Sequence, residues 1–87
     1  FIAALGDEAR LEAFRQANDL RKHGVSVDID YLERSLKSQM KFADKLGARK
    51  VAIIGEDELK GNYVILRDME TREQTRVPSG DLVKALL

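Results

Sequence analysis

The stretch Val51-Ala52-Ile53-Ile54-Gly55 decides the fold class of this 87-residue chain. It is continuously apolar, rich in β-branched side chains and closed by a glycine, so it predicts a strand that is buried on both faces. Such strands are typical of parallel sheets whose two faces are covered by helices. The segments on either side of it should therefore supply those helices.

The segments before this strand alternate between strand and helix patterns. Residues 1–5 predict a short buried strand that stops at Gly6, and residues 25–29 predict a second one. Between them, a helix begins at residues 6–8 and ends at His23 and Gly24. A second helix begins at its cap, Ser35, and ends at Gly47. The expected core positions of the two helices are Ala13, Phe14, Ala17 and Leu20, then Leu36, Met40, Ala43 and Leu46.

The segments after the strand predict a hairpin and a last helix. Residues 56–61 form an acidic turn, and strands over 63–67 and 74–77 are joined by a hairpin connection. Residues 78–80 start a helix that buries Leu82, Val83 and Leu86. This order predicts an α/β fold: a five-stranded mixed sheet, made of three parallel strands and a C-terminal hairpin, flanked by three helices.

Length and composition limit what the chain can do. Eighty-seven residues allow one domain, spanning 1–87, with a single core. The absence of cysteine excludes disulfides, cysteine-bound zinc and thiol catalysis, and a single histidine disfavours a histidine-based metal site. No apolar run approaches the ~20 residues that span a bilayer. Because the chain opens inside an apolar run, we interpret it as a piece of a longer protein.

Charge is balanced overall but not along the chain. Residues 32–50 hold six basic side chains and two acidic ones, against 15 of each in the whole sequence. Four of the basic residues fall within about 80° of each other on the second helix, at 100° per residue. These four form a basic stripe: Arg34, Lys37, Lys41 and Lys45. The stripe suits the phosphates of a nucleic acid, although lysine is also a common choice for a solvated helix face.

The candidate catalytic features are weak. No glycine-rich phosphate loop follows the first strand. The acids Glu56-Asp57-Glu58 can hold Mg²⁺ or simply form a solvated turn. His23 is a possible general base, but its position at a helix end favours an interaction with the helix dipole. Tyr31 and Tyr63 could stack on unpaired RNA bases, or could be half-buried strand and loop residues.

Four segments resemble a known family. They are Arg34-Ser35-Leu36-Lys37-Ser38-Gln39, Ala43-Asp44-Lys45-Leu46-Gly47-Ala48-Arg49, Ile53-Ile54-Gly55-Glu56-Asp57-Glu58-Leu59 and Leu66-Arg67-Asp68-Met69-Glu70-Thr71. With them, the chain resembles the C-terminal anticodon-binding domain of histidyl-tRNA synthetase, a class II aminoacyl-tRNA synthetase, and the resemblance covers nearly the whole chain. One departure is Arg72, which stands where the family usually has glycine, and which would be strained if its φ is positive.

The resemblance implies binding of the anticodon of histidine tRNA. Glu58 and Arg67 match residues that contact anticodon bases, while Arg34 and Lys37 match the start of the second helix beside the tRNA. With Tyr31 as a stacking candidate, these five residues are the expected site. Gln39 also matches, but it falls on the apolar side of its helix and should be structural.

The resemblance also implies a parent enzyme. A catalytic core that uses ATP, Mg²⁺ and histidine and forms a homodimer would lie upstream, in a cytoplasmic histidine–tRNA ligase, while this fragment would need no cofactor and catalyse nothing. Two alternatives stay open. One is a small-ligand or metal-binding α/β domain built on Glu56-Asp57-Glu58, and the other is a regulatory paralogue without tRNA specificity.

Overall fold

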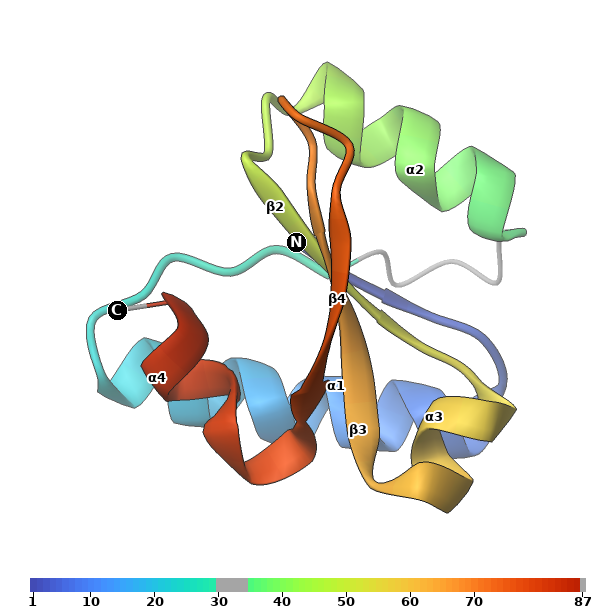
Figure 1. The fold of residues 1–87 in the computed structure, drawn as a ribbon, viewed down its shortest axis with the longest axis vertical. Helices are drawn as coiled ribbons and strands as arrows, with labels where there is room; N and C mark the ends of the chain where they lie inside the picture. The colour runs from blue at the N-terminus through green and yellow to red at the C-terminus, as the bar shows by residue number, and fades with distance from the viewer. Residues whose placement is uncertain (30–34, 87) are drawn as a thin grey trace.

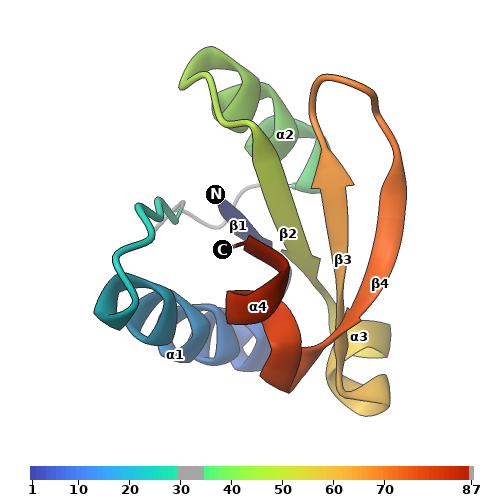
Figure 2. The same ribbon diagram turned by 60° about the vertical axis from the view of Figure 1, so that its left-hand side comes forward.

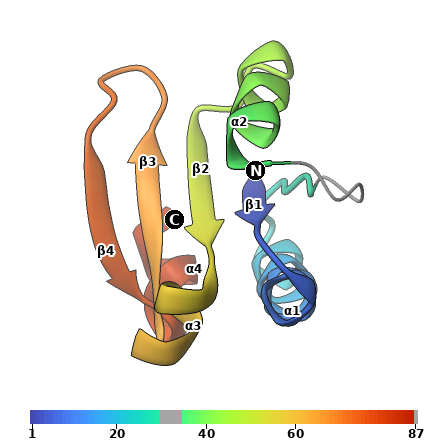
Figure 3. The ribbon, with the colours of Figure 1, turned by 90° about the vertical axis from the view of Figure 1, so that its right-hand side faces the viewer.

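A mixed four-stranded sheet forms the centre of the computed structural model, which describes residues 1–29 and 35–86. The strands are β1 (Ile2–Ala4), β2 (Lys50–Ile54), β3 (Tyr63–Asp68) and β4 (Gln74–Pro78), and they lie side by side in that order (Figure 3). β1 and β2 are parallel, whereas β3 is antiparallel to both β2 and β4. The predicted C-terminal hairpin is therefore confirmed.

Helices cover both faces of the sheet. α1 (Asp7–Lys22) and α4 (Leu82–Leu86), which follows a 3-10 turn at Ser79–Asp81, lie on one side. α2 (Leu36–Lys45) lies on the other side, and the short α3 (Glu56–Gly61) joins β2 to β3 (Figures 1 and 2). The prediction of a helix-covered α/β sheet is confirmed.

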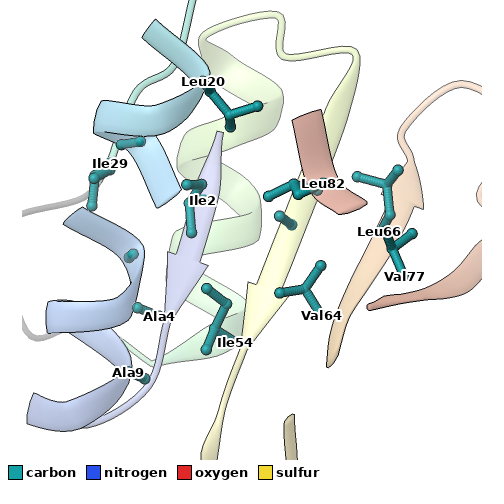
Figure 4. Close-up of a cluster of buried hydrophobic side chains, with 13 residues drawn as sticks. Ile2, Ala4, Ala9, Leu20, Ile29, Ile54, Val64, Leu66, Val77 and Leu82 are labelled. Carbon is teal, nitrogen blue, oxygen red and sulfur yellow. The ribbon is translucent and has the colours of Figure 1, made fainter. Parts of the chain in front are cut away.

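The β2 strand is buried on both faces, as its apolar sequence predicts. Ala52 and Ile54 belong to the larger core cluster, which α1 and α4 cover (Figure 4). Val51 and Ile53 belong to a smaller cluster beneath α2. Because side chains alternate along a strand, a continuous apolar run is what two covered faces require.

The prediction of five strands and three helices is wrong for the described residues. Segment 25–29 makes one isolated parallel bridge, between Ile2 and Ile29, and is not a strand. Only β1 and β2 are parallel neighbours in the sheet. The expected acidic turn at 56–61 is helix α3, so the described chain has four α-helices.

A buried glutamine completes the outer edge of β1. Gln39 on α2 is 2% exposed, and its Oε1 accepts a hydrogen bond from the Ala4 amide at 3.0 Å. Its Nε2 donates to the Ala4 carbonyl at 2.9 Å. One side-chain amide thus replaces the two hydrogen bonds that a neighbouring strand would supply, which explains why a full strand at 25–29 is not needed there. The structural role predicted for Gln39 is confirmed.

Two residues predicted for the core are exposed. Phe14 is 40% exposed because the buried stripe of α1 is made of small residues and includes Gln16, whose Nε2 donates to the Ser79 carbonyl at 2.8 Å. Leu46 is 49% exposed. α2 ends at Lys45, so helical spacing no longer predicts which way the side chain of residue 46 points. The predicted cap is present, since Ser35 Oγ accepts from the Ser38 amide at 3.2 Å.

Candidate nucleic-acid interface

One part of the sheet surface is left uncovered by helices. α2 packs over β1 and β2, so the β3–β4 half of the same face has no helix over it (Figure 3). On β3, Val64 and Leu66 point into the larger core, and the alternate residues point the other way. Cross-strand register places their β4 partners on the same side. We call this surface the open face; it consists of Tyr63, Ile65, Arg67, Gln74 and Arg76.

Arg67 lies on the open face, half-buried between Val51 of β2 and Gln74 of β4. Its Nη1 is 3.5 Å from Gln74 Oε1, at the long limit of a hydrogen bond. Its Nε is buried and has no acceptor among the described residues. A buried donor without an acceptor is uncommon and unfavourable. The long contact to Gln74 is the one hydrogen bond that the guanidinium makes to a described residue, so its Nη atoms keep donors for a ligand.

Glu58 lies on α3, at the end of β2. Its Oε1 accepts a hydrogen bond from the Gly55 amide at 2.9 Å, which is one half of a capping box at the start of that helix. Oε2 accepts none from the described residues. The carboxylate therefore has a structural contact through one oxygen and can accept a ligand's hydrogen bond through the other.

Glu58 and Arg67 flank the open face but do not meet. β3 leads from Tyr63, beside α3, to Arg67 near the hairpin turn. Four residues of strand cover about 13 Å at ~3.3 Å each. That length matches three to four stacked bases at roughly 3.4 Å each. The helix that carries Glu58 and the Arg67 guanidinium thus lie at opposite ends of a surface that is long enough for an anticodon.

The basic stripe is partly described. Lys37, Lys41 and Lys45 are all exposed on α2, and none of them forms an ion pair with a described residue. Unpaired lysines on one helix face favour phosphate contact, although a solvated face would look the same. The other two predicted site residues, Arg34 and Tyr31, lie outside the described residues.

The acidic segment 56–58 makes contacts within α3 and at its start. Glu56 Oε1 is 3.2 Å from Lys60 Nζ, and Glu58 caps α3. In residues 1–29 and 35–86, no three aspartate, glutamate, histidine or cysteine side chains are grouped as metal ligands. The acids thus serve the first turn of a helix, where negative charge is favourable.

Two further features lie away from the open face. His23 caps the end of α1, where its backbone amide donates to the Leu20 carbonyl at 3.0 Å, and its Nδ1 is 2.8 Å from the Asp19 carbonyl oxygen. A cavity of about 510 Å³ lies beside segment 25–28, between the end of α1 and the start of β2, and no predicted site residue lines it.

No helix of the described chain is both long and apolar enough to cross a bilayer.

The hairpin turn that ends the open face contains a strained residue. Arg72, which stands where the family usually has glycine, has φ 66°. The position therefore has the positive φ that strains a residue other than glycine. Asp68 Oδ1 accepts from the Glu70 and Thr71 amides at 2.9 and 3.1 Å. These hydrogen bonds, with Thr71 first, lower the pKa of the Asp68 carboxyl below its usual value of 3.8.

Sequence reasoning missed Gln74 and Arg76 as members of the candidate interface. Their signal was present, because both alternate with Thr75 and Val77 along a predicted strand. Which of the two alternating sets faces a covering helix depends on register and on where α2 packs, and the sequence does not give either.

The comparisons with known proteins agree with this architecture. The chain matches the family described as "Anticodon binding domain" over residues 1–87. It is 49% identical over 86 residues to a histidine–tRNA ligase of Caldanaerobacter subterraneus subsp. tengcongensis, covering 99% of this chain and 21% of the relative. The crystal structure of apo S. aureus histidyl-tRNA synthetase superposes with a TM-score of 0.94 at 39% identity, over 100% of this chain and 25% of that one.

A second solved structure, histidyl-tRNA synthetase from Nostoc sp. PCC 7120, gives a TM-score of 0.87 at 30% identity, over 97% of this chain and 21% of that one. The chain belongs to the anticodon-binding domain family. Within this family, its similarity is to the domain that histidine–tRNA ligases carry, as the resemblance implied. The chain spans about a fifth of the curated relatives that it matches.

Proposed function

We propose that this chain binds the anticodon loop of histidine tRNA on its open face and thereby positions that tRNA for an aminoacylating domain elsewhere in a parent protein. The observation that carries the proposal is the uncovered β3–β4 surface, which presents the incompletely bonded guanidinium of Arg67. Among the described residues, helices pack over the other face of the sheet and over the β1–β2 half of this one, which leaves the open face for a flat ligand such as a base.

Base discrimination is assigned to Glu58 and Arg67. A carboxylate only accepts hydrogen bonds, so Oε2 of Glu58 suits a guanine edge that presents N–H donors. A histidine anticodon carries guanine at its first position. An arginine fork donates in a plane to base oxygens and nitrogens, which lysine cannot imitate. β3 alone separates Tyr63, beside the helix that carries Glu58, from Arg67 by about 13 Å, so Glu58 and Arg67 can contact different bases of one anticodon.

Sequence-independent attraction is assigned to the basic stripe. Lys37, with Lys41 and Lys45 behind it, is exposed and free of ion pairs with described residues. Arg34 and Tyr31 precede α2, and we assign Arg34 to phosphate contact and Tyr31 to stacking. Each neutralised phosphate strengthens binding for every sequence and steepens its salt dependence by about one unit of slope.

The parent protein we propose is a homodimeric, ATP- and Mg²⁺-dependent histidine–tRNA ligase. In it, residues 1–87 would be the C-terminal domain and the catalytic domain would lie upstream. The length of the relatives, about five times that of this chain, supports the existence of such a domain. The fragment itself would have no aminoacylation activity and would need no cofactor. Its expected location, the cytoplasm, follows from a tRNA partner.

The test is titration of the chain with a histidine anticodon stem-loop and with base-swapped versions at several salt concentrations. Glu58→Gln keeps the capping acceptor and removes the charge, so it separates recognition from folding. We expect Glu58→Gln and Arg67→Lys to reduce discrimination between loops, and Lys37→Ala to weaken all loops alike.

Three outcomes decide the proposal. If Lys37→Ala alone changes base preference, the roles are reversed. If none of the three substitutions changes binding, tRNA contacts another surface. If Mg²⁺ alone binds to the chain and the stem-loop does not, the metal-binding alternative replaces the proposal.

A further inference from the structure

Tyr63 and Arg76 form a cation–π pair on the open face. Arg76 Cζ lies 4.8 Å from the centroid of the Tyr63 ring. Arg76 is opposite Ile65 in the β3–β4 register, so Tyr63 and Arg76 are diagonal neighbours across the two strands. Tyr63 lies at the α3 end of the open face, and Arg76 lies beside Ile65, between that end and Arg67.

The position of the tyrosine ring depends on Gly61. A Cβ atom at residue 61 would lie 2.4 Å from Tyr63 Cε1 and 2.6 Å from Cδ1, far inside van der Waals contact. The backbone of Gly61 therefore lies directly against the ring. Because Gly61 ends α3, the helix that carries Glu58, the ring and the carboxylate are positioned by one short element.

Arg76 is held by the ring and not by an acid. The residue is exposed, and it forms no ion pair with the described residues. As a contribution to stability alone, an exposed cation–π contact is worth only about 0.5–1 kcal/mol. A guanidinium without a carboxylate partner retains its hydrogen-bond donors and the face that is turned away from the ring.

We propose that Arg76, held on Tyr63, is a stacking platform for an unpaired base of the bound loop. This inference rests on the proposed function. It adds Arg76, which neither the sequence analysis nor the resemblance named, and it makes Tyr63, named there as a stacking candidate, the support for that arginine. RNA-binding proteins hold splayed bases on aromatic rings and on arginine planes. Because every base has a π-face, such a platform contributes affinity without choosing a base. Its effect should therefore differ from that of Glu58 or Arg67.

The test uses anticodon stem-loops with 2-aminopurine at one loop position, because stacking quenches this base. Arg76→Lys keeps the charge and removes the plane, and Tyr63→Leu removes the ring. We expect each to weaken cognate and base-swapped loops alike, about fivefold or more, and to restore fluorescence at one position. Tyr63→Phe keeps the ring and should behave as the wild type, as should Lys84→Ala, a charge removal on α4 across the sheet.

The outcomes separate this inference from the proposed function. If the wild type binds the loop and Arg76→Lys and Tyr63→Leu bind and quench equally well, the platform is disproved and the proposed function stands. If Arg76→Lys changes base preference, Arg76 reads a base and does not stack on it. If the wild type binds no loop, both ideas fail. Thermal melting of each variant checks folding, and the exposed Arg76 keeps the test valid if Tyr63→Leu is unstable.

Discussion

The two faces of the sheet use the same strands for different purposes. On the α1–α4 face, Val64, Leu66 and Val77 are buried under helices. On the opposite face, their neighbours along β3 and β4 are half-buried or exposed, because α2 extends only over β1 and β2. Residues one position apart thus belong either to the core or to a candidate binding surface. The difference teaches that a β-strand can hold the fold and present a ligand site at once, since its side chains alternate.

This comparison predicts that stability is concentrated on the closed face. Leu82→Ala, at a residue that is 0% exposed beneath the sheet, should cost about 2–5 kcal/mol of folding stability, as is typical of buried leucine truncations. Ile65→Ala on the open face is the matched control, and it should cost about 1 kcal/mol because that side chain is only half-buried. Urea unfolding followed by circular dichroism measures both. Equal losses would contradict the assignment of the two faces.

A second substitution tests how α2 stabilises the edge of β1 on the opposite face of the sheet. Gln39→Met keeps the size of the side chain but leaves the Ala4 amide and carbonyl without partners, which should cost about 1–3 kcal/mol. Lys41→Met, on the exposed side of the same helix, should change stability by less than about 0.5 kcal/mol. Hydrogen exchange at Ala4 should speed up in Gln39→Met alone. An unchanged Ala4 amide would mean that Gln39 is not the strand's partner.

Much of the fold was predictable because its signals are local. Each signal predicts structure at its own position: the apolar run at 51–55 predicts a strand, the glycines after α1 and α2 predict helix ends, and Ser35 predicts a helix start. The extra strand at 25–29 was wrong because its β-branched pattern does not reveal that Gln39 already bonds the same edge. Phe14 was assigned to the core for a similar reason: the spacing of α1 cannot tell that Gln16 takes the buried position.

The candidate site was predictable only in part. Glu58 and Arg67 came from the family resemblance. Their environments, a hydrogen bond from the Gly55 amide to Glu58 and a bond from Arg67 to Gln74, depend on the packed structure. The Tyr63–Arg76 pair joins residues 13 positions apart through strand register, which periodicity in one strand does not fix.

A third substitution tests whether the positive φ of Arg72, in the turn between β3 and β4, destabilises the fold. Arg72 adopts φ 66°, a conformation that costs most side chains about 1 kcal/mol or more. Arg72→Gly removes that cost but loosens the unfolded chain, so the net gain should be about 0.5 kcal/mol. Arg72→Ala is the control and should bring no gain, because alanine keeps the strain. The comparison is made by thermal melting, and a gain in Arg72→Ala equal to that in Arg72→Gly would show that side-chain charge, not φ, is responsible.

The smallest effect concerns pH and the same turn. The pKa of Asp68 is lowered in the folded chain, so its carboxylate form stabilises the fold above the usual pKa of 3.8. That contribution is lost as the pH falls below about 4 and through the lower folded pKa. Asp68→Asn should therefore be less stable than the wild type near neutral pH, and the gap should close in acid. Glu73→Gln, an exposed residue of the same hairpin connection whose carboxylate accepts no hydrogen bond from the described residues, serves as the control. Urea midpoints measured at pH ~6 and pH ~3 give the two gaps, and a gap that widens in acid would contradict the assigned hydrogen bonds.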